Sequence, residues 1–398
     1  MANSCDILIS GGGVAGLTAA VVFGDAGVDV ICVDPAPPIT VRDAEGADLR
    51  TTAILQPARD LLEPCGLWDR FAPYAAPLQV MRIVDAGGAR PEPRIVRDFN
   101  ASEVSDQPFG WNLPNWLLRR ELVARLTDLP NVDFRPGTGT TSLFTRQSEA
   151  RVGLDDSSRV KARLVIAADG RDSPMRQAAG IDVHTTRYGQ KALAFAVNHS
   201  VPHENVSTEI HRSGGPFTLV PLPDHNGHPS SAVVWMEHGP RATSLFQMDQ
   251  PDFEAEMTER SCGLFGPLTL ASRRTIWPII TQKADRMSGE RIALMAESAH
   301  VVPPIGAQGL NMSLADLRAL LDLALARPEG LGDMQMLDAY HDARIRDVAL
   351  RAQGIDLLNR ASMLDARPLR DARAAGLDAL YSLKPVRRTL MQMGLGVR

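Results

Sequence analysis

Short apolar runs that end at a glycine or an acid alternate with helical periodicity in the first part of the chain. Residues 7–9 form one such run, and residues 28–33 form a second run that ends at Asp34. A short apolar run between polar residues or glycines is typical of a strand buried in a parallel sheet. The pattern therefore predicts a strand, a glycine turn, a helix and a second strand.

The turn after the first run carries glycines at G-x-G-x-x-G spacing. Gly11 permits a tight turn, Gly13 lets the backbone approach a diphosphate, and Gly16 lets the helix lie close to the strand. The helix start would direct its amides at that diphosphate, and Asp34 is placed to bind an adenosine ribose. Glycines alone also fit a plain turn, but with both strands they predict a dinucleotide site for FAD or NAD(P).

Two further apolar runs end in an acid. Residues 162–168 lead to Asp169-Gly170, and residues 291–296 lead to Glu297. A plain turn would explain the first, but its place at the carboxyl edge of the same sheet favours a ligand contact. After Glu297, a proline-rich turn and a glycine loop open a helix from about Leu310, whose free amides would offset negative charge on a ligand.

Alternating apolar and polar residues predict a β-rich region that roofs a pocket. The segments concerned are 81–85, 94–97, 193–197, 206–211, 217–222 and 232–237. Residues 223–229 are expected to form a polar loop. Helices are expected at about 53–62 and 116–126, and a further strand at 132–135.

Composition narrows the function classes. The chain has 398 residues, 44% of them hydrophobic, which suits two or three domains. A net charge of −5, with no basic run among aromatics, argues against nucleic-acid binding. No leader pattern and no apolar run of about eighteen residues occur, so we expect a cytoplasmic protein that does not span a membrane.

Cysteine and histidine spacing predicts no metal site. The cysteines lack C-x-x-C pairing and are expected to be core thiols in a reducing compartment. The histidines of the β-rich region show no ligand spacing with acids and are expected to be exposed in loops. They are His199, His203, His211, His225 and His228.

In this order, and over nearly the whole chain, the motifs resemble the class A FAD-dependent aromatic monooxygenases of the para-hydroxybenzoate hydroxylase type. The segment from Glu297 to Asn311 and the C-terminal tail look most like the ubiquinone-biosynthesis hydroxylases. The resemblance implies an α/β fold in which a Rossmann-like FAD-binding domain is interleaved with a β-sheet substrate domain, followed by C-terminal helices. The FAD-binding domain would span 1–70, 105–180 and 280–340, the substrate domain 71–104 and 181–279, and the C-terminal helical region 341–398.

The resemblance also implies which residues bind FAD. They are Gly11, Gly13, Val14, Ala15, Gly16, Asp34, Arg50, Arg119, Asp169, Gly170, Glu297, Pro304, Gly306, Gln308, Gly309, Leu310 and Asn311. Arg119 is preferred to Arg120 because it stands three residues before Leu122. The family usually has Gly-Asp where this chain has Ala296-Glu297, which keeps the carboxylate on a side chain one methylene longer. No catalytic side chain is assigned.

In such an enzyme NAD(P)H reduces the flavin, O2 forms a flavin C4a-hydroperoxide, and the distal oxygen passes to a phenolic ring. A polyprenylated phenol of ubiquinone biosynthesis is the expected substrate. A soluble aromatic acid is an alternative and would favour an arginine in the roof, with Arg212 and Arg241 as candidates. A flavin-dependent isoprenoid reductase and a non-catalytic flavin-fold subunit of a biosynthetic complex are the others.

The last fifteen residues combine basic and apolar side chains without an acid. They include Lys384, Arg387, Arg388 and Arg398 with Leu390, Met391, Met393 and Leu395. Such a segment suits contact with an anionic membrane surface, here the inner face of the cytoplasmic membrane, and equally suits a helix packed on its own protein or on a partner.

Overall fold

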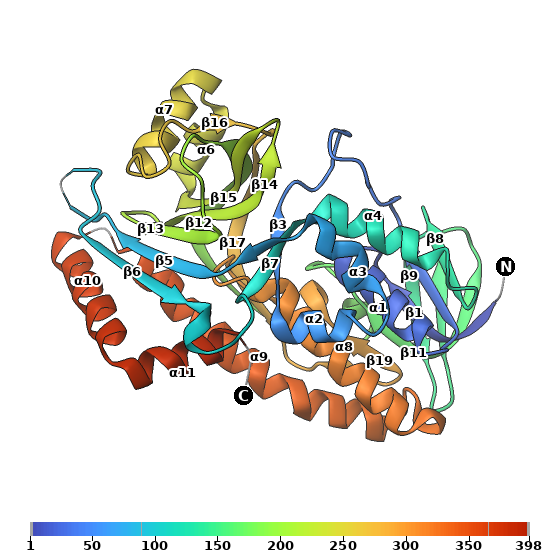
Figure 1. Cartoon of the computed structure of the whole chain (residues 1–398). Helices are drawn as coiled ribbons and strands as arrows, with labels where there is room; N and C mark the ends of the chain where they lie inside the picture. Colours follow the sequence, from blue (N-terminus) through green and yellow to red (C-terminus); the bar gives the residue numbers. More distant parts are fainter. Residues whose placement is uncertain (1–2, 89, 365, 396–398) are drawn as a thin grey trace.

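The first sheet of the molecule is built from the predicted buried runs. The computed structural model describes residues 3–88, 90–364 and 366–395. The parallel centre of this eight-stranded sheet, which lies on the right in Figure 1, has the pairing order β19, β11, β1, β2, β8. These strands are Ile292–Leu294, Arg159–Ala167, Ser4–Ser10, Val30–Asp34 and Val132–Pro136. The antiparallel additions are β18 (Ser288–Gly289), β9 (Thr140–Thr145) and β10 (Ala150–Leu154).

Helices cover this sheet and complete its core. They are α1 (Val14–Asp25), α4 (Asn115–Leu126) and α8 (Gln308–Ala326), with the short α5 (Pro174–Ala178) after β11. The side chains of Ile7, Leu8 and Ile9 are completely buried, as are Leu17 and Phe23 of α1. The predicted strand, glycine turn, helix and second strand are therefore confirmed.

The second sheet has nine strands and two different faces. Its strands are β5 (Val80–Asp85), β6 (Ile95–Asn100), β12 (Val183–Asn198), β13 (Val206–His211), β14 (Pro216–His225), β15 (His228–His238), β16 (Thr269–Leu270), β17 (Thr275–Ala284) and β20 (His300–Val301). The order is β20-β17-β12-β15-β14-β13-β5-β6 with β16 beside β12, and the only parallel pair within this path is β13 with β5. One face packs on α6 (Gly239–Gln247) and α7 (Gln250–Arg260), while the other faces the first sheet (Figure 1).

A small sheet and short helices join the two parts. The sheet contains β3 (Thr51–Leu55), β7 (Gly110–Pro114) and β4 (Ala76–Leu78), and α2 (Gln56–Leu62) and α3 (Leu67–Phe71) follow β3. Single 3-10 turns lie at Ala72–Tyr74, Ala101–Glu103, Ala296–Ser298 and Pro328–Gly330.

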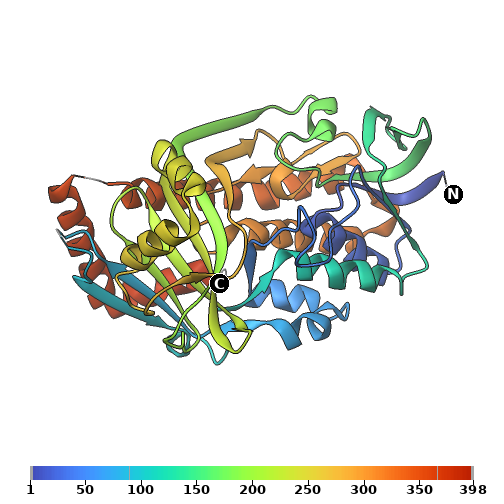
Figure 2. The same cartoon turned by 90° about the horizontal axis from the view of Figure 1, so that it is seen from above.

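Three helices end the chain. The long α9 (Met334–Ser362) extends along both parts of the molecule, and α10 (Arg367–Ser382) and α11 (Lys384–Leu395) lie near β6 (Figures 1 and 2). Arg97 of β6 forms an ion pair with Asp378 of α10. No helix among the described residues is both long enough and apolar enough to cross a membrane. The α/β class with several sheets and C-terminal helices is confirmed, whereas the domain boundaries given above stay a prediction.

Three local predictions are wrong. The expected helix at 53–62 begins only at Gln56, because residues 51–55 pair with β7 as strand β3. The expected loop at 223–229 is a tight hairpin, because Asn226 and Gly227 take positive φ angles of 53° and 77°, which suits a two-residue turn.

The histidines are the third. His199 is buried, with ring nitrogens 2.8 Å from the carbonyl of Val201 and 2.9 Å from Ser231 Oγ. Of the five, only His228 is exposed, because most of the others lie in or beside strands whose side chains are packed.

The cysteines are all free, and burial raises the pKa of Cys5 to about 12.

Candidate cofactor and substrate site

A cavity of about 810 Å³ lies between the carboxyl edge of the first sheet and the inner face of the second. This volume falls within the range of small-molecule sites. Every residue predicted to bind FAD lines this cavity except Gly16 and Asn311. We call its first-sheet side the floor; it holds the glycine turn, Arg50, Arg119, Asp169, Glu297 and the loop 303–309. We call its second-sheet side the roof, formed by Met81, Ser207, Glu209, Thr218, Val220, Val234, Trp277 and Ile279.

The glycine turn leaves room for a diphosphate. A Cβ on Gly16 would lie 1.9 Å from the carbonyl oxygen of Gly11, so this glycine is needed for helix packing. A Cβ on Gly13 would meet no described atom within 4 Å, and Gly13 caps α1 at the cavity. Asp34 accepts hydrogen bonds from the amides of Gly12 (2.5 Å) and Ala36 (2.8 Å). The open side of Gly13, together with the helix start, is the backbone cradle that a bound diphosphate needs.

Arg50 and Arg119 reach the cavity, and Asp48, an acid that was not predicted as a site residue, holds both there. Asp48 accepts two hydrogen bonds from Arg50, at 2.8 and 2.7 Å, and lies 3.9 Å from Arg119 Nη2. Burial raises the pKa of Asp48, but the hydrogen bonds and charge of Arg50, together with Asn115 and Arg119, outweigh burial, and the net shift of the pKa is downward. The Nε of Arg119 is buried and has no hydrogen-bond partner among the described residues. Arg120 instead pairs with Glu121 outside the cavity.

The two carboxylate oxygens of Asp169 differ, because one is hydrogen-bonded within the protein and the other has no partner among the described residues. Its Oδ2 accepts bonds from Ser10 Oγ (3.3 Å) and the amide of Met175 (3.1 Å). Its Oδ1 is buried without a partner in the part of the chain that the structure describes. Burial raises the pKa of this carboxyl group. The free oxygen is thus available to a hydroxyl or amide of a ligand.

Glu297 lies in a 3-10 turn that begins with a left-handed residue. Ala296 has a φ of 56°, and Glu297 Oε2 lies 3.8 Å from Nε of Arg171. The side chain of Glu297 is 50% exposed, so its extra methylene is accommodated at the cavity edge. Arg171 follows the predicted Asp169-Gly170 pair directly but was not predicted as a site residue.

The loop 303–309 before α8 bends sharply and is held in place by hydrogen bonds of Gln308 and Asn311. Gly306 and Ala307 have φ angles of 64° and 55°. Gln308 donates to the carbonyls of Gly306 (2.9 Å) and Gly394 (3.1 Å), and its Oε1 accepts from Arg351 (2.9 Å). The amide of Asn311 donates to the carbonyls of Ala53 and Ala307, so Asn311 fixes the loop to β3 instead of lining the cavity.

A buried charged network supports this loop, and two of its three members, Asp316 and Arg344, lie outside the Glu297 to Asn311 segment. His300 lines the cavity, and its Nε2 lies 2.6 Å from Asp316 Oδ2. Asp316 also accepts from Arg344 of α9 at 2.8 Å and is completely buried. Burial raises the pKa of Asp316, but His300 and Arg344 outweigh it and lower the pKa below its ordinary value.

The roof is mainly apolar and carries one charged side chain, Glu209. The arginines considered for a substrate carboxylate lie elsewhere: Arg212 pairs with Glu259, and Arg241 pairs with Glu256 of α7. Among the described residues that line the cavity, every basic side chain other than histidine belongs to the floor.

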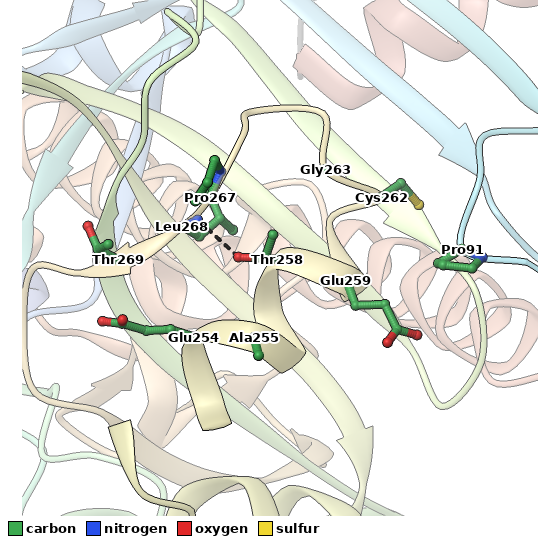
Figure 3. A pocket seen from close by; sticks show the side chains of 10 residues that line it. All are labelled: Pro91, Glu254, Ala255, Thr258, Glu259, Cys262, Gly263, Pro267, Leu268 and Thr269. Atoms are coloured by element: carbon green, nitrogen blue, oxygen red, sulfur yellow. Dashed lines mark hydrogen bonds between the residues drawn. The ribbon is translucent and has the colours of Figure 1, made fainter. Parts of the chain in front are cut away.

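A second hollow of about 620 Å³ lies on the outer side of α7 (Figure 3). It contains Cys262, and Thr258 Oγ1 there accepts a hydrogen bond from the amide of Leu268 (3.0 Å). Phe253 and Met257 of α7 pack on the second sheet, so the sheet separates this hollow from the cavity. It shares no residue with the cavity, and burial raises the pKa of the Cys262 thiol.

Comparisons with known proteins agree with this geometry. The model of a family described as "FAD binding domain" matches residues 4–353. A ubiquinone hydroxylase, UbiL of Rhodospirillum rubrum, is 32% identical over 394 residues, which cover 98% of this chain and 89% of that protein. The 3-demethoxyubiquinol 3-hydroxylase of Escherichia coli is 26% identical over 98% of both chains. The crystal structure of p-nitrophenol 4-monooxygenase PnpA from Pseudomonas putida has the same fold, with a TM-score of 0.80 and 18% identity over the whole of both chains.

The interleaved sheets, the diphosphate cradle and the three strands that lead to Asp34, Asp169 and Glu297 define an FAD-dependent monooxygenase. The chain belongs to the FAD binding domain family, that of the class A flavin monooxygenases, in which NAD(P)H is the typical co-substrate. The site fits its cofactor, because the open Gly13, the unpartnered Nε of Arg119 and the free Oδ1 of Asp169 lie where a dinucleotide would satisfy them.

Proposed function

We propose that the protein hydroxylates an uncharged phenolic ring, with a polyprenylated phenol of ubiquinone biosynthesis as its substrate and NAD(P)H and O2 as co-substrates. The observation that carries this proposal is the roof, which combines apolar side chains with one carboxylate and offers no arginine or lysine among the described residues. The ubiquinone hydroxylases named above support the same choice.

We assign the floor to FAD, which supplies oxygen activation when bound. Gly13 and the start of α1 would hold the diphosphate, Asp34 the ribose, and Arg50 and Arg119 the phosphates or ribityl chain. The amides that begin α8, next to Gln308 and Gly309, would face the flavin ring and stabilise negative charge on it. A second dinucleotide fingerprint does not occur in the sequence, which suits a nicotinamide donor that docks transiently.

The rival functions find less support. A carboxylate on the substrate ring would be repelled by Glu209 in the roof, and no arginine or lysine among the described roof residues could pair with it. This disfavours an aromatic acid as substrate. A non-catalytic subunit would fit the departure from the family's Gly-Asp at Ala296-Glu297, yet Glu297 keeps its carboxylate at the cavity edge. An isoprenoid reductase is distinguished from a hydroxylase by oxygen consumption.

The test is a spectrum of the purified protein, followed by anaerobic additions of NADH and NADPH with and without a prenylated phenol, and then by the admission of O2. We expect bound flavin whose reduction is accelerated by the phenol, and a hydroxylated product formed with equivalent O2 consumption. A protein unable to take up FAD, or reduction with no oxygen incorporated into the ring, would overturn the proposal.

We further propose that α11 rests on an anionic membrane surface. Val386, Leu390 and Met393 of α11 are exposed, as is Leu383 just before the helix. Lys384 and Arg388 are exposed with no ion pair among the described residues. The inner side packs on the protein, because Met391 is buried beside Leu78 and Phe109 and Arg387 pairs with Glu103. Arg398 and the side chain of Leu395 lie outside the described residues.

Vesicle flotation tests this contact. We expect the protein to float with vesicles that contain phosphatidylglycerol and to remain below with pure phosphatidylcholine. The double variant Lys384→Gln/Arg388→Gln should float less. Equal flotation of variant and wild type with anionic vesicles would contradict the proposal.

A further inference from the structure

Strand β13 places a carboxylate in the roof by simple alternation. Thr208 and Ile210 point to the far side of the sheet and are completely buried, Ile210 in the core beneath α7. Ser207 and Glu209 therefore point to the opposite face, where both line the cavity, and His211 shares that face. The position of Glu209 in the roof follows from the register of the strand.

Glu209 differs from every other acid of the cavity. Asp34, Asp48, Asp155, Asp169 and Glu297 all belong to the floor, and each lies beside a donor from a backbone amide or an arginine. Within the described residues, no lysine or arginine pairs with Glu209. Its partner is Nε2 of His211, 2.7 Å from Oε1.

The surroundings of Glu209 suit an uncharged ring that carries a hydroxyl group. Thr218 of β14 lies opposite it in the sheet, and the other residues nearby on the roof are Met81, Val220 and Val234. A carboxylate in such a setting accepts a short, strong hydrogen bond from a phenol hydroxyl. The same negative charge repels a carboxylate on a substrate.

We propose that Glu209 is the specificity-determining residue of the substrate half of the cavity. It accepts the hydrogen bond of the ring hydroxyl and excludes rings that carry a carboxylate. The proposal rests on the proposed function, namely that the substrate is a phenol. A hydroxyl bonded to a carboxylate also leaves more electron density on the ring, which favours attack by an electrophilic oxygen.

His211 acts through Glu209 and is a positioning residue. Its ring is largely buried, with the side chain 15% exposed, and its Nε2 holds the carboxylate in place. Its Nδ1 is buried without a partner among the described atoms. The ring therefore serves one hydrogen bond only, the one to Glu209.

The experiment measures binding, not turnover. Two probes are titrated into the FAD-loaded protein and followed by the change in the flavin spectrum: a phenol with one isoprenyl group ortho to the hydroxyl, and the same phenol with a carboxylate para to the hydroxyl. Wild type should bind the acid at least about tenfold more weakly than the phenol. Glu209→Gln should weaken phenol binding roughly ten- to a hundredfold, the range of a lost hydrogen bond to a charged group, and bind the acid no more weakly than wild type does.

Two further variants make the result decisive. Glu256→Gln removes an acid from the outer surface of α7, where its partner is Arg241, and should bind both probes as wild type does. Glu209→Arg should reverse the preference and bind the acid more tightly than the phenol. FAD content and thermal unfolding show whether each variant is folded. If Glu209→Arg does not fold, the isosteric Glu209→Gln alone tests the role of Glu209.

The outcomes separate the two proposals. If wild type binds the phenol and Glu209→Gln binds both probes as wild type does, the role of Glu209 is overturned and the proposed function stands. If wild type preferred the acid, or bound neither probe, the proposed function would fall and the role of Glu209 with it.

Discussion

The floor and the roof of the cavity are built by different means. The floor is shaped by backbone: glycines without a Cβ, left-handed residues at Ala296 and Ala307, and helix starts at Val14 and Gln308. The roof is shaped by side chains on regular strands, whose backbone groups already pair with each other. A backbone floor suits an invariant cofactor, whereas a side-chain roof can be altered residue by residue to select a substrate.

The largest effect is expected where buried charges support the floor. Asp316→Ala should lower the free energy of unfolding by about 3–5 kcal/mol, because it leaves Arg344 and His300 without their shared buried partner. Urea unfolding measures the change. Asp322→Ala removes an exposed carboxylate from the same helix and should shift stability by less than about 0.5 kcal/mol. A similar small loss for both variants would show that the network does not support the fold.

The same carboxylate should make stability sensitive to acid. The pKa of Asp316 is lower in the folded protein than its ordinary value, because His300 and Arg344 outweigh the effect of burial. Its contribution is therefore complete above about pH 4, the ordinary aspartate range, and is lost as the pH falls through the lower folded pKa. The stability difference between wild type and Asp316→Asn should shrink below about pH 4. A difference that stays constant down to the acid transition would contradict this.

The floor could be predicted from the sequence because backbone geometry demands particular residues. Gly11 and Gly16 are needed where a side chain would overlap the neighbouring backbone, and an acid at the end of an apolar run marks a strand edge. The Asp316 network could not be predicted, since its members lie 16 and 28 residues apart on separate elements and meet only in the folded chain.

The roof could be predicted only in outline. Alternation on β13 indicates two faces, but which face meets the cavity depends on pairing with β5, more than 120 residues earlier. Likewise residues 51–55 form a strand because distant β7 pairs with them, against a local helical pattern. The hairpin at Asn226-Gly227 is different, because its signal is local and the sequence contained it.

A matched pair of glycines separates folding from cofactor binding in the floor. Gly16→Ala should lower the stability of the protein by roughly 1–3 kcal/mol, because its Cβ would overlap the Gly11 carbonyl. Gly13→Ala should leave the stability of the FAD-free protein nearly unchanged, since its Cβ projects into open space. Its Kd for FAD should rise roughly 5- to 150-fold through crowding of the diphosphate. Unchanged FAD binding in Gly13→Ala would place the diphosphate elsewhere.

Two neighbouring arginines on α4 test a side-chain contact of the floor. Arg119→Gln should raise the Kd for FAD about tenfold, because a charged hydrogen bond to the cofactor is lost. Arg120→Gln should leave the Kd unchanged, because that side chain pairs with Glu121 outside the cavity. Fluorescence titration of the FAD-free protein measures both. An equal effect of the two changes would point to general charge instead of a contact at Arg119.

The smallest expected effect lies in the roof and should spare the floor. His211→Leu removes the hydrogen bond that positions Glu209, so the Kd for the isoprenyl phenol should rise only roughly threefold, because the lost bond acts on the phenol through Glu209 and not directly. His211→Gln restores a donor and should recover part of that loss. Neither change should alter the Kd for FAD, because His211 lies outside the cavity lining and beyond the floor. If instead both variants lost FAD binding and phenol binding together, the floor and the roof would not be independent. Strand β13 would then maintain the shape of the whole cavity, and His211 would not act on the choice of substrate ring.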